Sequence, residues 1–299
     1  MSLENLTTEQ RNRNSMHIDT MSTLEMVKTI NQGNEKVAAA VESQNEAIAG
    51  AIDVGSKHYH NGGRLIYIGA GTSGRLGILD AVELVPTYGI EPERAIGLIA
   101  GGKQAMYLAV EGAEDDPQLA ASDLEKLNLT QKDVVIGIAA SGRTPYVIGG
   151  LDYAKKVGAA TIAVACVKNS LIGQHAEIAI EAVTGPEVIT GSTRMKAGTA
   201  QKMILNTIST GIMIKQGKVY QNVMIDVLPT NEKLVARAVR IISTVTDVSA
   251  EQAKDVLEKA DKNVGLAIVM AKAKLDKDQA KALLAKHGNN VSDVLQELK

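Results

Sequence analysis

The segment IYIGAGTSGRLGILDAVELVPTYG, residues 66–89, contains three patterns in a fixed order. An apolar run typical of a buried strand enters a glycine-rich turn, and the turn opens into a helical pattern. Free N–H groups at the start of such a helix can bind a phosphate. The turn GAGTSG (69–74) also matches G-x-G-x-x-G, which by itself is weak evidence for dinucleotide binding.

Side chains in this turn favour a phosphate monoester over a dinucleotide. A dinucleotide site needs an acid at the end of the second strand, and the next strand candidate ends GLIAGGKQA (97–105), without one. Thr72, Ser73 and Gly74 could donate hydrogen bonds to a terminal phosphate, which exposes more oxygens than a pyrophosphate. The alternative is that Thr72 or Ser73 only caps the helix.

Strand and helix patterns alternate from Gly63 onward. The strand candidates are mostly continuous apolar runs, as expected for strands that helices cover on both faces. They are RLIYIGA (64–70), AIGLIAG (95–101), DVVIGIAAS (133–141), ATIAVAC (160–166) and EIAIEA (177–182). The sequence therefore predicts an α/β fold with a parallel sheet between two helical layers, and a ligand at the carboxyl ends of the strands.

A second loop repeats the design of the first. In IAASGRTPYVIGGL (138–151), a strand ends at Ser141, and Gly142, Arg143 and Thr144 lead to a proline suited to a first helical turn. We expect this loop to meet the same phosphate from the other side. Arg143 could pair with the phosphate or remain a solvated surface charge.

Helical patterns flank this core on both sides. Residues 23–60 repeat apolar residues at helical spacing, with a Ser22–Glu25 capping box and a break expected at Gly33. Residues 192–217 read as one long helix, and the chain after Val235 shows three short helical patterns and no strand. We expect a helical segment at 1–52, the α/β domain at 53–218 and a small helical domain at 219–299.

Composition excludes several classes of protein. The 299-residue chain has a net charge of −2 and contains no Trp or Phe, which argues against nucleic acid or an anionic membrane as partner. A single cysteine, Cys166, excludes a disulfide scaffold and a thiolate metal cluster. With no signal-peptide core and no apolar stretch of about 20 residues, the expected location is the cytoplasm.

The two loops together resemble the sugar isomerase (SIS) domain, which binds phosphosugars through Ser/Thr-rich loops. Over about half of the chain, the motifs are similar to those of the N-acetylmuramic acid 6-phosphate etherase family. They are TEQRNRNSMHID (8–19), GTSGRLGILDAVELVPTYG (71–89), AVEGAEDD (109–116) and TGPEVITGSTRMKAGTAQKMILN (184–206). Val82, Val85 and Arg13 depart from the family pattern, outside the residues assigned to chemistry.

The resemblance implies a flavodoxin-like SIS fold, a UBA-like C-terminal domain and a homodimer with shared sites. It implies a lyase of amino-sugar catabolism and peptidoglycan recycling that splits the C3 ether of N-acetylmuramic acid 6-phosphate into N-acetylglucosamine 6-phosphate and D-lactate. No metal or redox cofactor is expected. By the same resemblance, Glu83 is the acid and Glu114 the second acid/base.

Two carboxyl groups suit this reaction. Once the sugar ring opens, a base can remove the C2 proton, lactate can leave from C3 with a proton from an acid, and water can add back. One carboxyl group must be protonated and the other ionised, so their surroundings must differ. We expect Glu83, after the apolar LGILDAV, to be partly buried. Glu114 has acidic neighbours; without the resemblance it would read as a solvated loop acid.

One spacing conflicts with a simple site. Glu83 follows Ser73 by ten residues, which on one straight helix is about 15 Å of rise, more than a hexose phosphate spans. Either the path is distorted before Pro86, or Glu83 serves a site built with a second subunit.

A third acid precedes the long helix. Glu187 occupies a position that resembles the glutamate of SIS isomerases, where it could bind sugar hydroxyls or remove the C2 proton. Ser192, Thr193 and Lys196 could contact the sugar or its phosphate. The alternative is helix capping together with an exposed lysine.

Two other functions remain open. A phosphosugar isomerase would use the same loops and one glutamate, and a phosphosugar-sensing regulator would bind without turnover. The pairing of Glu83 with Glu114 favours the etherase.

Overall fold

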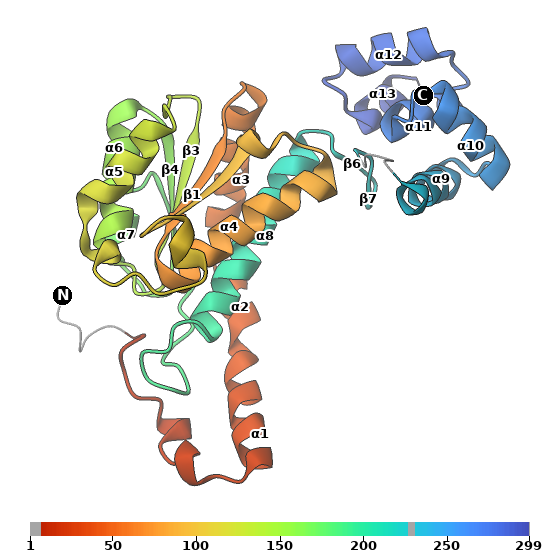
Figure 1. The fold of residues 1–299 in the computed structure, drawn as a ribbon. Helices are drawn as coiled ribbons and strands as arrows, with labels where there is room; N and C mark the ends of the chain where they lie inside the picture. The colour runs from red at the N-terminus through yellow and green to blue at the C-terminus, as the bar shows by residue number, and fades with distance from the viewer. Residues whose placement is uncertain (1–6, 227–230, 299) are drawn as a thin grey trace. The chain divides into compact units, whose positions relative to one another are not determined.

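The computed structural model describes residues 7–226 and 231–298, and its centre is a parallel sheet (Figure 1). In the described residues this sheet has five strands in the order β2-β1-β3-β4-β5. The strands are β1 (Leu65–Gly69), β2 (Ala95–Ile99), β3 (Val134–Ile138), β4 (Ala160–Ala165) and β5 (Ile178–Glu181). Every predicted strand is confirmed, and β1, β3 and β4 are buried along their whole length.

Helices form a layer on each face of the sheet (Figure 1). One layer contains α5 (Pro117–Lys126), α6 (Pro145–Val157) and α7 (Leu171–Gln174); the other contains α3 (Asn45–His60), α4 (Gly71–Tyr88) and α8 (Lys196–Lys215). The α5–α6 layer packs on Ile66, Ile68 and Val135. On the other face glycines allow close approach: a Cβ at Gly97 would lie 2.5 Å from Ile78 of α4. The predicted three-layer α/β class is confirmed.

A buried aspartate ties α4 and α8 to strand β1. Asp80 of α4 accepts hydrogen bonds from the Tyr67 hydroxyl (2.7 Å), Asn206 Nδ2 (2.6 Å) and the Ser209 hydroxyl (3.2 Å). Burial and the neighbouring carboxylate raise the pKa of Tyr67, so the phenol remains a donor. A buried acid with three donors is fully satisfied, and the network fixes how the two helices lie on β1.

The N-terminal region contains more helices than the sequence predicted. The 3₁₀ turns η2 (Arg13–Ser15) and η3 (Ile18–Thr20) precede α1 (Thr23–Asn34) and α2 (Lys36–Glu42), which lead into α3. The capping box between Ser22 and Glu25 is confirmed. The break expected at Gly33 is wrong by two residues, because α1 continues through Gly33 to Asn34 and the break falls at Glu35. A second break falls at residues 43–44.

Short connections complete the α/β core. The 3₁₀ turns η4 (Pro92–Arg94), η5 (Lys103–Met106) and η6 (Ala113–Asp115) link α4 to α5 around β2. The long helix predicted at 192–217 begins four residues late, at Lys196, because residues 192–195 form a turn.

The chain divides into two compact units, one of residues up to 82 and 92–209, the other of residues 83–91 and 210 onward. In the second unit, β6 (Val219–Tyr220) and β7 (Val223–Met224) form an antiparallel pair. The helices that follow are α9 (Glu232–Thr246), α10 (Ala250–Lys259), α11 (Val264–Ala273), α12 (Lys277–Lys286) and α13 (Val291–Glu297). The prediction of three helices after Val235 is therefore wrong; the domain boundaries at 52/53 and 218/219 stay predictions.

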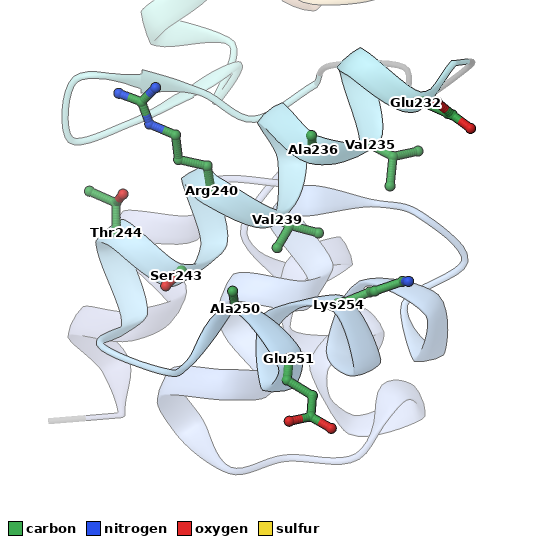
Figure 2. A pocket seen from close by; sticks show the side chains of 10 residues that line it. All are labelled: Glu232, Val235, Ala236, Val239, Arg240, Ser243, Thr244, Ala250, Glu251 and Lys254. Carbon is green, nitrogen blue, oxygen red and sulfur yellow. The ribbon is translucent and has the colours of Figure 1, made fainter.

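A hollow of about 820 Å³ lies between α9 and α10 (Figure 2). Val235, Ala236 and Val239 of α9 and Ala250 of α10 give it an apolar floor, and Glu232, Arg240, Glu251 and Lys254 carry charges around it. Because two acidic and two basic side chains surround the hollow, their charges cancel and do not favour an anion. None of the predicted site residues lines it.

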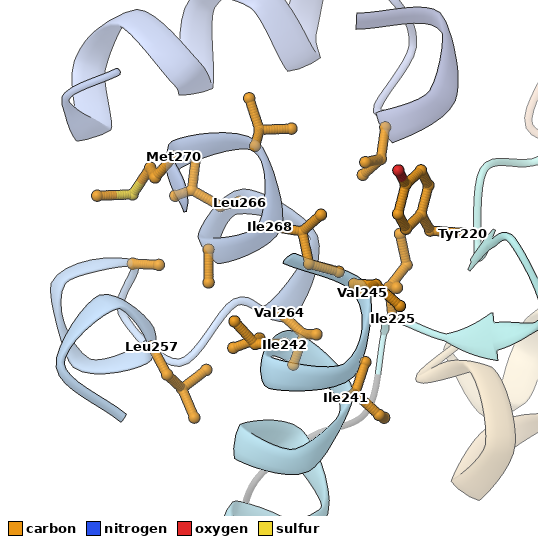
Figure 3. Packing of buried hydrophobic residues seen from close by; sticks show 14 of the residues in the cluster. Tyr220, Ile225, Ile241, Ile242, Val245, Leu257, Val264, Leu266, Ile268 and Met270 are labelled. Atoms are coloured by element: carbon orange, nitrogen blue, oxygen red, sulfur yellow. The ribbon is translucent and has the colours of Figure 1, made fainter. Parts of the chain in front are cut away.

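The core of the second unit explains the missed helices (Figure 3). Helix α11 is buried from Val264 to Met270, so apolar residues surround it and no helical periodicity shows in its sequence. Capping boxes at Ser249–Gln252 and Asp276–Gln279 start α10 and α12. In the described residues, no helix is long and apolar enough to cross a membrane.

Candidate active site

The sheet brings the two predicted loops together. Strands β1 and β3 are neighbours, with Gly69 opposite Ile138 at their carboxyl ends. The first loop begins directly after Gly69, and the second begins directly after Ile138, so both leave the same carboxyl-end edge of the sheet. Parallel strands deliver both loops to one side of the sheet, where α/β proteins bind ligands.

The first loop is shaped by glycine and by a buried serine. A Cβ at Gly74 would lie 2.7 Å from the carbonyl oxygen of Gly69, so only glycine fits there. Thr72 is half-buried, and Ser73 is 7% exposed. The Ser73 hydroxyl donates a hydrogen bond to Gln201 Oε1 of α8 at 2.9 Å. The alternative that Ser73 only caps its own helix is therefore wrong.

The second loop leaves several donors near the surface. Gly142 has φ = +68°, and its carbonyl accepts a hydrogen bond from Ile172 N–H at 2.9 Å, which anchors the loop. Ser141, Arg143 and Thr144 are half-buried. Thr144 is the N-cap residue of α6, with a proline following as predicted, yet its side chain makes no capping hydrogen bond. Its hydroxyl is thus not used by the helix.

Glu187 and Lys196 hold the start of α8. Glu187 is 1% exposed and accepts hydrogen bonds from the backbone N–H of Lys196 (3.1 Å) and Ala197 (2.9 Å). Lys196 Nζ donates to the carbonyls of Thr184 (2.9 Å) and Pro186 (2.7 Å). Burial lowers the pKa of Lys196, although Glu187 acts in the opposite direction. The alternative of an exposed lysine is wrong, and the start of the helix is capped by Glu187.

The turn before α8 carries the remaining predicted residues. Ser192 and Thr193 are half-buried there. The N-terminal motif supports the same loop from outside, since Asn12 Nδ2 donates to the Pro186 carbonyl (3.3 Å) and the Ser15 hydroxyl to the Val188 carbonyl (2.7 Å). Two motifs that are far apart in the sequence thus pack together around the turn before α8.

Glu114 shares a cavity with the first loop. The cavity has a volume of about 250 Å³, and its lining includes Ala70, Gly71, Arg75 and Glu114. Glu114 lies in η6 and is exposed, as the reading of a loop acid predicted. Arg75 donates to the carbonyls of Met106 (3.0 Å) and Ala105 (2.7 Å), which fixes the turn that walls the cavity.

Glu83 does not line this cavity. It is on α4, which continues through Pro86 to Tyr88, so the helix path is not interrupted between Ser73 and Glu83. Ten residues of helix correspond to about 15 Å of rise. Glu83 is exposed, so the expectation of partial burial is wrong for the single chain, and it is not among the residues that line the cavity. In the apolar run before it, Gly77 and Ile78 pack on the sheet, whereas Leu79 and Val82 are 49% and 60% exposed.

Sequence reasoning missed two residues that hold the candidate site in shape, Arg75 and Gln201. Both lie within quoted motifs, but their contacts join positions that are 30 and 128 residues apart in the sequence. A buried glutamine within an apolar helical face was the signal available for Gln201.

Family models match most of the chain. The N-terminal SIS domain of glucokinase regulatory protein matches residues 47–155, the SIS domain residues 115–210, and the C-terminal lid domain of glucokinase regulatory protein residues 221–263. A Lactobacillus gasseri protein named N-acetylmuramic acid 6-phosphate etherase is 69% identical over 99% of this chain and 100% of its own. An Enterococcus faecalis protein named N-acetylmuramic acid 6-phosphate etherase 1 is 58% identical over 99% and 98%.

Solved structures share the fold of the α/β core. A phosphoheptose isomerase from Francisella tularensis matches with a TM-score of 0.50 at 15% identity, covering 65% of this chain and 100% of its own. At that identity the similarity shows the fold alone.

Proposed function

The chain belongs to the N-acetylmuramic acid 6-phosphate etherase family, and we propose that it cleaves the C3 D-lactyl ether of N-acetylmuramic acid 6-phosphate. The products are N-acetylglucosamine 6-phosphate and D-lactate. One structural observation carries the proposal: the cavity beside the phosphate loop also contains a carboxylate, Glu114. A carboxyl group at that position could transfer protons to or from a sugar bound beside the loop.

The phosphate is proposed to bind where the two loops meet. Thr72, Ser73 and Gly74 would donate from the first loop, and the second would donate through Ser141, Gly142, Arg143 and Thr144. Thr144 is half-buried and its hydroxyl does not cap α6, which supports this assignment. Ser192 and Thr193 are proposed to contact the sugar, with Glu187 and Lys196 contributing through the turn that they hold.

The reaction would proceed by elimination and addition. In the open-chain sugar, a carboxylate removes the C2 proton, the C2–C3 double bond forms, and the C3–O bond breaks as a carboxylic acid protonates the departing lactate oxygen. Water then adds to C3 through its oxygen, and a proton returns to C2. Each proton transfer contributes roughly 10²–10⁴-fold to the rate. We propose Glu114 and Glu83 for these steps, without dividing the roles between them.

We further propose that Glu83 acts in a site completed by a second copy of the chain. The support is that α4 runs unbroken past Ser73 and that Glu83 is exposed. Mixed dimers of Ser73→Ala and Glu83→Ala subunits test this. Recovery of activity on mixing two inactive variants would support sharing, and none in proven heterodimers would argue against it. A cytoplasmic homodimer is part of the proposal.

The decisive experiment is a coupled assay for D-lactate with N-acetylmuramic acid 6-phosphate as substrate. Wild type, Glu83→Ala and Glu114→Ala are compared with Glu125→Ala, an exposed acid on α5, as the matched control. Lactate from wild type and the control, but not from the other two, is expected. If wild type binds the sugar phosphate saturably but releases no D-lactate, an isomerase or a sensor would be favoured instead.

A further inference from the structure

The Ser73 hydroxyl and the Gln201 carboxamide form a buried pair with one atom left over. Ser73 Oγ donates to Gln201 Oε1 at 2.9 Å, and the two residues are 7% and 0% exposed. Gln201 Nε2 is buried and has no hydrogen-bond partner among the residues that the structure describes. Buried amide groups in folded proteins are rarely left unpaired, so this one needs an explanation.

The direction of the Ser73 hydrogen bond matters for phosphate binding. A serine hydroxyl has one proton, and here that proton is donated to Gln201. While it is so used, Ser73 presents only lone pairs to a phosphate, whose oxygens are acceptors as well. The pair must therefore rearrange before Ser73 can donate to the substrate.

Gln201 lies on the part of α8 that contacts the first loop. Gly198, one turn earlier, is close enough that a Cβ there would lie 3.5 Å from Thr72 Cγ2. Residues three apart share a helix face, so Gln201 and Gly198 both face the loop. The carboxamide is thus placed behind the phosphate loop and not in the general core.

We propose that Gln201 is a positioning residue that reverses the Ser73 hydrogen bond when the sugar phosphate binds. The carboxamide turns about its last torsion, Nε2 donates to Ser73 Oγ, and the hydroxyl proton passes into a hydrogen bond with a phosphate oxygen. This inference rests on the proposed function of the loop. The turn needs little space, because the oxygen and the NH₂ of an amide have nearly the same size and this torsion is broad.

The hydrogen-bond count explains why the turn occurs only with ligand. Before and after it, Gln201 makes one hydrogen bond to Ser73 and has one amide atom unpaired. The bound state gains a charge-assisted hydrogen bond from Ser73 to the phosphate, which is stronger than a neutral one. Without phosphate, the turn of the carboxamide gains no hydrogen bond.

Variants at Gln201 separate positioning from mere packing. Gln201→Glu places an acceptor-only group beside Ser73 and adds a negative charge near the phosphate. We expect it to weaken binding of inorganic phosphate and of N-acetylglucosamine 6-phosphate on the order of 10–100-fold. Gln201→Met keeps the volume without a hydrogen bond, and about tenfold weaker binding is expected. Gln174→Glu, at an exposed position on α7, is the matched control and should leave both affinities unchanged.

The test is calorimetric titration of the full chain with both ligands, run with D-lactate kinetics and a melting curve for each variant. The Gln201→Met effect should fall below twofold in a Ser73→Ala background, because the hydroxyl that it positions is absent. It should appear in KM more than in kcat. In Gln201→Glu the deficit relative to wild type at the same pH should shrink as the pH falls, since a protonated carboxyl can donate to Ser73 as the amide does.

Equal effects of Gln201→Met with and without the Ser73 hydroxyl would overturn the proposal, and so would a pH-independent deficit in Gln201→Glu. If Gln201→Met does not fold, the pH dependence of Gln201→Glu still decides. Failure of the etherase itself gives a different result, because wild type would then release no D-lactate while the phosphate titrations remained interpretable.

Discussion

Replacing Glu187 by glutamine separates a structural role from a chemical role for the third acid. Both oxygens of Glu187 accept backbone N–H groups at the start of α8, at 3.1 and 2.9 Å, and the side chain is 1% exposed. Glutamine keeps one acceptor but turns its NH₂ toward the other N–H. Hydrogen bonds to a charged group contribute about 1.5–3 kcal/mol each, so losing one and weakening the other should cost about 2–4 kcal/mol.

Thermal unfolding followed by circular dichroism measures this cost. For a unit of this size, each kcal/mol lowers the melting temperature by about 2–4 °C, so a decrease of about 5–15 °C is expected. Glu177→Gln, an exposed acid without these contacts, is the control and should melt with wild type. Lactate release measured well below the transition should be retained within a few-fold. A variant that melts like wild type but has lost its activity would refute the structural reasoning, because residues selected for chemistry often cost stability instead of providing it.

Three further predictions concern the loops and the core. Gly142→Ala should abolish phosphate binding and lower the free energy of unfolding, measured with denaturant, by about 2–5 kcal/mol. The reason is that Gly142 has φ = +68° and a Cβ there would lie 2.5 Å from a neighbouring Cβ. Gly62→Ala is the control, because Gly62 has φ = +86° but open space around it, so only the smaller backbone cost should appear. Burial acts to raise the pKa of Asp133, but hydrogen bonds from Arg64 and from backbone N–H groups hold it below its usual value. Its contribution to stability is therefore present above about pH 4 and lost below it, so the stability gap between wild type and Asp133→Asn should close in that range of an acid titration. Burial, with the charge of a nearby glutamate, raises the pKa of Cys166 to about 12, so a thiol reagent at pH 8 should label it only after unfolding in denaturant; rapid labelling of the native chain would contradict the burial.

The α/β core could be predicted from the sequence because its strands are covered on both faces. Continuous apolar runs such as 134–138 and 160–165 stand out against the amphipathic helices between them. The same logic failed for α11, where an apolar run belongs to a buried helix. Burial on all sides removes the periodicity that distinguishes the two, and only length and β-branched content remain as signals.

The candidate site was predictable where it follows the backbone. Glycine turns at the ends of β1 and β3 fix loop positions locally, so Ser73 and Ser141 could be placed from motifs alone. What the motifs do not encode is the direction of a side chain. Ser73 turns inward to Gln201 because α8 packs there, and that packing depends on contacts more than 100 residues away in the sequence.

Exposure of both proposed acids bears on how the site is completed. A carboxyl group that donates a proton near neutral pH has to be taken out of water or placed beside another negative charge. Glu114 and Glu83 are each exposed in the single chain, and the cavity that Glu114 lines is small. The chain alone therefore supplies the two loops proposed to bind the phosphate, but not the dry environment that the proposed elimination requires. A second copy that covers Glu114 and delivers its own Glu83 would provide both at once, which is why the mixed-subunit experiment tests the chemistry and the assembly together.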